Sequence, residues 1–167
     1  MRGGGLWAGH RCNFNPRSGG VPGTSRFWGL SLHLLDLHDV GIVGISGNLL
    51  AKKRRLNEQE TEMVRKHPFL GSKMLEGVPG LEATRRAILE HHEHFDGSGY
   101  PYGLRGEDIS ISARILSVAE FYDSAVSARP HCGAITPEEG VQILRGGSGT
   151  LFDPEVAQLF TAATPPH

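Results

Sequence analysis

The chain of 167 residues is long enough for one domain with a substantial core, because a chain of this size buries about two-thirds of its unfolded surface. Its 17 Lys and Arg against 18 Asp and Glu give a formal net charge of -1, so no overall basic field is available to hold duplex nucleic acid. Cys12 and Cys132 have no paired spacing, which argues against a disulfide framework or a zinc ribbon. No apolar run approaches the roughly 20 residues that span a bilayer. We therefore expect a cytoplasmic protein without a membrane span.

The first 28 residues are rich in glycine and arginine and show no sustained helical spacing of apolar side chains. Such a composition buries too little apolar surface to offset the entropy of ordering. We expect residues 1–28 to be disordered and residues 29–167 to form the domain. Apolar residues at the start of the domain predict a helix over 27–39 that ends at Gly41, with His38 and Asp39 at its end.

Shorter helices are predicted in the next third of the chain. The basic run over 52–55 is interpreted as a solvated loop, and Asn57 followed by Glu60 predicts a capped helix that stops at His67 and Pro68. Residues 69–75 predict one or two further helical turns, broken by the Gly-Val-Pro-Gly run at 77–80. Residues 81–92 predict a helix with two histidines at its C-terminal end.

A glycine-rich loop over 96–106 precedes the last three predicted helices. The first of these should cover 111–126, and the other two should begin after Thr136 and Asp153, each of which precedes a proline. No alternating strand pattern of useful length competes, so the predicted fold class is all-α. The long helix is expected to bury one apolar face, made of Ile111, Ile115, Val118, Ala119, Tyr122 and Val126.

Histidines stand at the ends of three predicted helices, namely at 38, at 67 and at 91–92. Helix ends far apart in sequence can converge on one point in space. Imidazole nitrogens combined with carboxylate oxygens suit iron, manganese or zinc. Because His38 is followed directly by Asp39, and a pair at a helix end can serve two ions, the pattern predicts a site for more than one metal ion.

Several motifs occur in a fixed order: LHDVG at 37–41, KHP at 66–68, HHEHFDGSGYP at 91–101, ARILSVAEFYDS at 113–124, ARP at 128–130 and GSGTLFDPEV at 147–156. Together they resemble the HD-GYP domain, over roughly residues 34–160. That family is an all-helical, metal-dependent phosphohydrolase module whose substrate is cyclic di-GMP. The resemblance implies an HD-domain helical bundle with a C-terminal helical GYP extension.

The resemblance also implies roles for individual residues. The metal ligands would be His38, Asp39, His67, His91, His92 and Glu120. His38 and Asp39 would be catalytic, with Asp39 bridging two divalent ions, iron or manganese, and a metal-activated hydroxide would attack the phosphodiester. Tyr100 and Arg129 would bind substrate. The family also uses the GYP loop to contact diguanylate cyclase domains.

Purely structural interpretations stay open for three of these positions. Glu120 occupies a position where the family usually has aspartate, and it could be a solvated residue beside an apolar helix face. The loop that carries Tyr100 could be a rigid surface loop. Arg129 could cap the preceding helix.

Three departures from the family pattern bear on activity. Ile42 stands where the family has a lysine, and a second lysine expected after the Arg-Pro pair is missing around Cys132. Each would remove a cation beside phosphate. The glycine-rich start replaces further helices of the family, so the domain is expected to lack its first helices and a third metal. These departures keep open a degenerate module that binds nucleotide or signalling partners, and a phosphohydrolase for another nucleotide or phosphoester.

Overall fold

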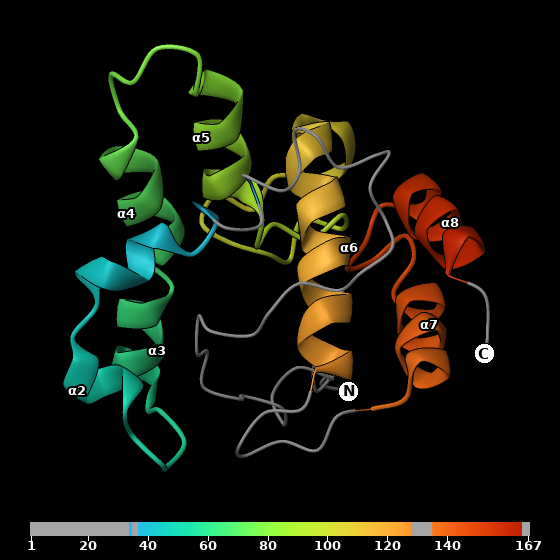
Figure 1. Ribbon diagram of the computed structural model, residues 1–167, viewed down its shortest axis with the longest axis horizontal. Helices are drawn as coiled ribbons and strands as arrows, with labels where there is room; N and C mark the ends of the chain where they lie inside the picture. The colour runs from blue at the N-terminus through green and yellow to red at the C-terminus, as the bar shows by residue number, and fades with distance from the viewer. Residues whose placement is uncertain (1–33, 35–36, 128–134, 165–167) are drawn as a thin grey trace.

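The computed structural model describes residue 34 and residues 37–127 and 135–164, which form an all-helical fold (Figure 1). The predicted fold class is therefore confirmed. Residues 1–28 and Arg129, for which disorder and substrate binding were expected, lie outside the described residues. The elements in chain order are η2 (Val40–Gly44), α2 (Gly47–Leu50), α3 (Glu58–Val64), α4 (His67–Met74), α5 (Glu82–Glu90), η3 (Gly106–Asp108), α6 (Ile111–Val126), α7 (Pro137–Gly146) and α8 (Pro154–Ala163).

Helix α6 is the central element of the described fold. In Figure 1 it stands between α3, α4 and α5 on one side and α7 and α8 on the other. Both sides pack against it, α5 on one and α7 with α8 on the other. None of the helices in the described ranges is both long and apolar enough to cross a membrane.

The junction of α3 and α4 differs from the prediction in one respect. The predicted cap is present, because the Asn57 side chain accepts from the Glu60 backbone N–H at 2.9 Å and Glu60 returns the bond. However, α3 ends at Val64, and His67 and Pro68 begin α4 instead of ending α3. Proline fits the first turn of a helix, where its missing N–H has no intrahelical partner in any case. His67 is thereby fixed at a helix start.

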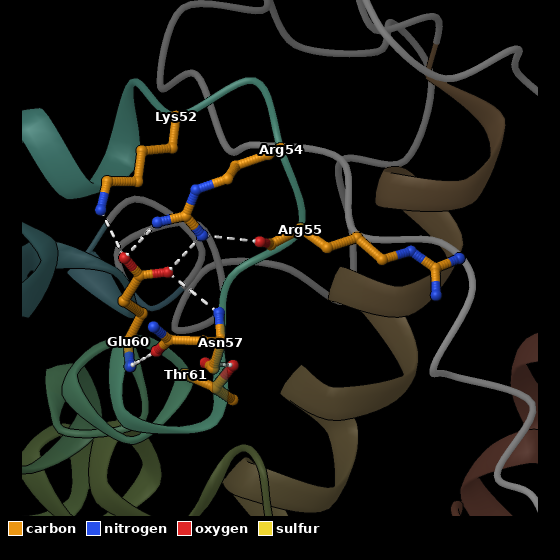
Figure 2. A network of polar contacts seen from close by, with 6 residues as sticks. All are labelled: Lys52, Arg54, Arg55, Asn57, Glu60 and Thr61. Carbon is orange, nitrogen blue, oxygen red and sulfur yellow. Dashed lines mark hydrogen bonds and ion pairs between the residues drawn. The ribbon is translucent and has the colours of Figure 1, made fainter.

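The basic run over 52–55 is only in part the solvated loop that was predicted. Figure 2 shows Lys52 and Arg54 gathered around the Glu60 carboxylate, with Arg54 at 2.7 and 2.8 Å from its two oxygens. Hydrogen bonds from Arg54 and Lys52 hold the pKa of Glu60 well below its ordinary value. The exposed Arg55 side chain points away from this network. Two of the four cations are therefore occupied in holding the loop to the start of α3.

Among the described residues, two apolar clusters lie along α6. The first joins Leu34, Ala87, Ile109 and Ala113, with Leu104 packed against it, and the second joins Val118, Leu144, Phe152 and Ala157. The predicted face of α6 is correct for Val118 and Ala119 but wrong at its N-terminal end. There Ile111 and Ile115 are 52% and 37% exposed, whereas Ala113 and Leu116 are buried and Ala113 belongs to the first cluster.

The 3-10 helix η2 packs directly on α4 through glycine. A Cβ atom at Gly41 would lie 2.0 Å from the His67 carbonyl oxygen and 2.5 Å from the Gly71 backbone nitrogen. No side chain fits at that distance. The contact brings the His38 and Asp39 turn, which directly precedes η2, against the start of α4.

Candidate metal centre

Side chains from three separate segments meet at one point of the fold. His38 and Asp39 lie in the turn before η2, His67 is the first residue of α4, and His91 and His92 follow the last residue of α5. Their arrangement follows from the element boundaries, because each histidine lies at or next to the start or end of a helix. The structure thus brings together the histidines at which the sequence pattern pointed.

Three imidazoles form the centre of the cluster. The Nε2 atom of His67 lies 3.4 Å from His91 Nε2 and 3.2 Å from His92 Nε2. Each of the three residues offers one ligand atom, and these atoms all lie within 4.8 Å of one another. The His38 ring packs edge-on against the His91 ring, with 5.5 Å between centroids.

Backbone carbonyls determine how two of these rings are protonated. His67 Nδ1 lies 2.8 Å from the Val64 oxygen, and His91 Nδ1 lies 2.6 Å from the Ile88 oxygen. A carbonyl only accepts, so in both rings Nδ1 must donate, and in the neutral ring Nε2 then carries a lone pair. Two lone pairs 3.4 Å apart cannot hydrogen-bond to each other. A metal cation would resolve this contact, and such fixing of the distal nitrogen is usual for metal-bound histidine.

Burial keeps the rings in their neutral form. It lowers the pKa of His91 to about 3 and holds the pKa of His92 well below 6.5, with the neighbouring histidines adding to the shift. The pKa of His67 is also lowered, chiefly by burial. Since a metal binds the neutral imidazole, the donor set fits a metal ion at neutral pH.

The Asp39 carboxylate faces two histidines at once. Its Oδ1 atom lies 3.3 Å from His67 Nε2 and its Oδ2 atom 3.3 Å from His38 Nε2. Burial by itself would raise the pKa of Asp39, but the adjacent His38, followed by His67 and His91, outweighs it, so the pKa lies below its ordinary value. Asp39 is therefore ionised at neutral pH and offers an oxygen on each side.

Glu120 reaches the cluster from the middle of α6. Its Oε2 atom lies 3.9 Å from His91 Nε2, and a quarter of its side chain is exposed. The carboxylate therefore points toward the histidines, but it is farther from them than Asp39 is. The four histidines, Asp39 and Glu120 thus lie close together, and their role as metal ligands stays a prediction.

The glycine-rich loop covers one side of the cluster. The Tyr100 ring stacks on the His92 ring, with centroids 4.8 Å apart and planes at 25°, and its backbone N–H donates to the His92 carbonyl at 3.1 Å. On the Tyr100 ring lies the guanidinium carbon of Arg65, 5.1 Å from the centroid. Tyr100 is therefore placed beside the candidate ligands.

Two further residues near the site were not singled out from the sequence. Glu93 is buried, and its carboxylate accepts backbone N–H bonds from Tyr102 at 2.6 Å and Leu104 at 3.0 Å. Because Glu93 directly follows His92, these bonds hold the loop next to a candidate ligand. The place of Glu93 inside the HHE motif was a signal for such a role, whereas nothing in the sequence near Arg65 indicates its contact with Tyr100.

Comparisons with known proteins agree with this geometry. Residues 28–156 match the family model described as HD domain. The chain is 39% identical over 132 residues to a probable cyclic di-GMP phosphodiesterase of Vibrio cholerae serotype O1, covering 74% of the chain and 30% of that protein. It is 40% identical over 120 residues to the cyclic di-GMP phosphodiesterase response regulator RpfG of Xanthomonas campestris, covering 71% of the chain and 32% of the relative.

A solved structure supports the fold. The crystal structure of the cyclic GMP-AMP specific phosphodiesterase V-cGAP3 of V. cholerae aligns with a TM-score of 0.57 and 21% identity, over 79% of this chain and 38% of that one. At that identity the likeness concerns the fold alone. The chain spans about a third of the length of the curated relatives named above. By its sequence match and its helical fold, the chain belongs to the HD domain family and is related to the HD-GYP cyclic di-GMP phosphodiesterases.

Proposed function

We propose that the chain is a metal-dependent phosphodiesterase that opens a cyclic dinucleotide, with cyclic di-GMP as the first candidate substrate. The observation that carries the proposal is the convergence of His67, His91 and His92, with Nε2 atoms 3.2 and 3.4 Å apart. The names of the relatives support the substrate class.

The same residues would hold the metal. His67, His91 and His92 supply imidazole nitrogens, and Asp39 supplies an ionised carboxylate. A divalent ion bound there would neutralise charge on the phosphate and would lower the pKa of bound water, so that a nucleophile is available near neutral pH. The chain itself orients the ligands, through the Val64 and Ile88 carbonyls, and so fixes the site before any ion binds.

We propose two ions, iron or manganese, in place of one. Support comes from Asp39, whose two oxygens lie near different histidines. A carboxylate that binds two cations would have its oxygens arranged in this way. His38 would then belong to one ion and His67 to the other. Glu120, beside His91, would supply the second carboxylate ligand after Asp39.

Tyr100 would hold the substrate. Its ring lies next to His92, where a base attached to a metal-bound phosphate could stack, and its hydroxyl can donate a hydrogen bond. The Glu93 carboxylate holds the loop behind it through the Tyr102 and Leu104 N–H groups. The loop would thus form a preset wall of the substrate site.

The test is metal analysis combined with product analysis on the purified full chain. Protein reconstituted with iron or manganese should contain about two ions per chain and convert cyclic di-GMP to its linear dinucleotide. 3'3'-cGAMP, cyclic di-AMP and a nucleotide monoester provide the comparison substrates. A protein that binds metal but opens none of the cyclic dinucleotides would reject the proposed substrate class, and one that cannot be loaded with metal would reject the mechanism.

A second candidate function is protein binding through the same loop, including binding to diguanylate cyclase domains. Tyr102 favours it, because this aromatic side chain is 61% exposed on a loop that Glu93 fixes in place. Exposed aromatic residues on a preset surface are typical of protein contacts. Capture of diguanylate cyclase domains by the wild type and equally by Tyr102→Ala would exclude this loop as the contact.

A further inference from the structure

Arg65 is the C-cap residue that directly follows α3, and it lies at the rim of the candidate metal centre. Its guanidinium carbon is 5.1 Å from the centroid of the Tyr100 ring, and that ring stacks on His92 at 4.8 Å. One aromatic ring therefore separates a permanent positive charge from a candidate metal ligand. His67 follows Arg65 by two residues, so the α3 and α4 junction that places the ligand also places the cation.

The Arg65 side chain is weakly held. Its Nη1 donates to Glu62 Oε1 at 2.9 Å, but the two side chains are 48% and 58% exposed. Exposed ion pairs of this kind contribute about 0 to 1 kcal/mol, so Arg65 can leave Glu62 for a better partner at little cost. Lys52 and Arg54 differ, because both are engaged by Glu60 (Figure 2).

The chemistry of a cyclic dinucleotide calls for a cation at such a place. The molecule carries two phosphodiester groups, and only one of them can sit on the metal ions while it is cleaved. The other lies across the ring of the molecule, beyond the reach of the ligands. Arginine suits a phosphate group, because its planar fork can donate two parallel hydrogen bonds.

We propose that Arg65 binds the second, uncleaved phosphate of the cyclic dinucleotide and so positions the first phosphate on the metal ions. This assignment rests on the proposed function. It gives the site a cation from the C-cap of α3, whereas position 42, close to Asp39, holds the uncharged Ile42. When Arg65 turns from Tyr100 to the phosphate, the face of the Tyr100 ring that it covers becomes available to a base.

Steady-state kinetics of metal-loaded Arg65→Gln with two substrates tests the assignment. With cyclic di-GMP the KM should rise about ten- to a hundredfold, the loss expected for one charge-assisted hydrogen bond, while kcat changes much less. Bis(p-nitrophenyl) phosphate has a single phosphate, so its cleavage should suffer at least about tenfold less. Arg65→Lys should recover part of the affinity, because it keeps the charge and loses the fork.

The matched control is Arg55→Gln, which removes an exposed arginine that points away from the neighbouring polar network. Its kinetics should equal those of the wild type. An unchanged KM for cyclic di-GMP in Arg65→Gln overturns the assignment, as does an equal loss with both substrates or a reduced metal content. If the wild type itself opens no cyclic dinucleotide, the proposed function fails, whereas an active wild type matched by Arg65→Gln refutes Arg65 alone.

Discussion

Two rings of the metal centre are oriented by carbonyls close to them in sequence. His67 Nδ1 contacts the Val64 carbonyl and His91 Nδ1 the Ile88 carbonyl, each three residues back along the chain. The end of a helix leaves such carbonyls without an intrahelical partner. Each ring is therefore oriented by a carbonyl close to it in sequence. The packing of the segments then brings the Nε2 atoms together.

Removal of one ligand should therefore release metal without unfolding the chain. His92→Ala should weaken metal binding by more than about a hundredfold, because changes in residues that merely support a ligand already cost ten- to a hundredfold. His94→Ala is the control, since His94 lies two residues away and its Nδ1 contacts Ser98 Oγ at 2.9 Å instead of the cluster. Metal content after dialysis and a melting curve would measure both. Equal metal in His92→Ala and His94→Ala would contradict the cluster.

Glu120 is tested by removal of its charge alone. Glu120→Gln keeps the size of the side chain, and we expect about tenfold weaker metal binding in a chelator competition assay. Asp123→Asn removes an exposed charge three residues farther along α6 and should have no effect. If the two variants bound metal alike, Glu120 would be the solvated residue that the sequence also allowed.

The sequence could indicate which histidines gather, but it could not indicate how they are held. Helix ends and the motif order predicted the positions of His38, His67, His91 and His92. The orientation of the rings depends on carbonyls whose direction is set only once the helix boundaries are known. The contact of Arg65 with Tyr100 joins segments 35 residues apart and has no local signature.

At the scale of elements, the errors of prediction arose where one residue type permits two structures. Pro68 can end a helix or occupy its first turn, and here it occupies the first turn of α4. On α6, both the set with Ile111 and Ile115 and the set with Ala113 and Leu116 have helical spacing. Contact with Ala87 on α5, which spacing does not encode, selects the second set.

The packing of η2 on α4 is specified by one glycine. Gly41→Ala should destabilise the fold by about 3 kcal/mol, the upper end of the range for an overpacked site, because its Cβ would meet the His67 carbonyl oxygen at 2.0 Å. It should also weaken metal binding, since Asp39 is placed by the same contact. At Gly47 in α2, no described heavy atom lies within 4 Å of the added Cβ. Gly47→Ala should therefore leave urea unfolding nearly unchanged, and similar losses in both variants would contradict the close contact.

At the scale of the whole molecule, α6 joins two clusters that would otherwise be separate. Its N-terminal half packs with Ala87 of α5, and its C-terminal half packs with Leu144 of α7 and Ala157 of α8. Arg114 on α6 also pairs with Asp153, which caps α8 by accepting from the Glu155 and Val156 N–H groups. The position of Glu120 on α6 therefore depends on both clusters.

The Arg114 and Asp153 pair should make the stability of the fold depend on acid. Burial raises the pKa of Asp153, but the hydrogen bonds from Arg114 and from the Val156 and Glu155 backbone outweigh it, so the pKa in the folded state lies below 3.8. The folded state therefore favours the ionised carboxylate. The stabilisation is complete above the pKa of the unfolded chain and is lost as pH falls through the lower, folded pKa.

Asp153→Asn isolates that charge, because asparagine caps a helix about as well as aspartate. Its free energy of unfolding at pH 7 should be about 1 to 3 kcal/mol lower than that of the wild type, since Arg114 is only 17% exposed and loses a charged partner. Denaturant unfolding from pH 7 to pH 3 should show a constant difference down to about pH 5 and a shrinking difference below pH 4. Asp123→Asn removes an exposed charge from α6, the helix that carries Arg114, and should follow the wild type throughout. A difference that already vanishes between pH 7 and pH 5 would mean that a histidine, and not Asp153, controls the acid response of the fold.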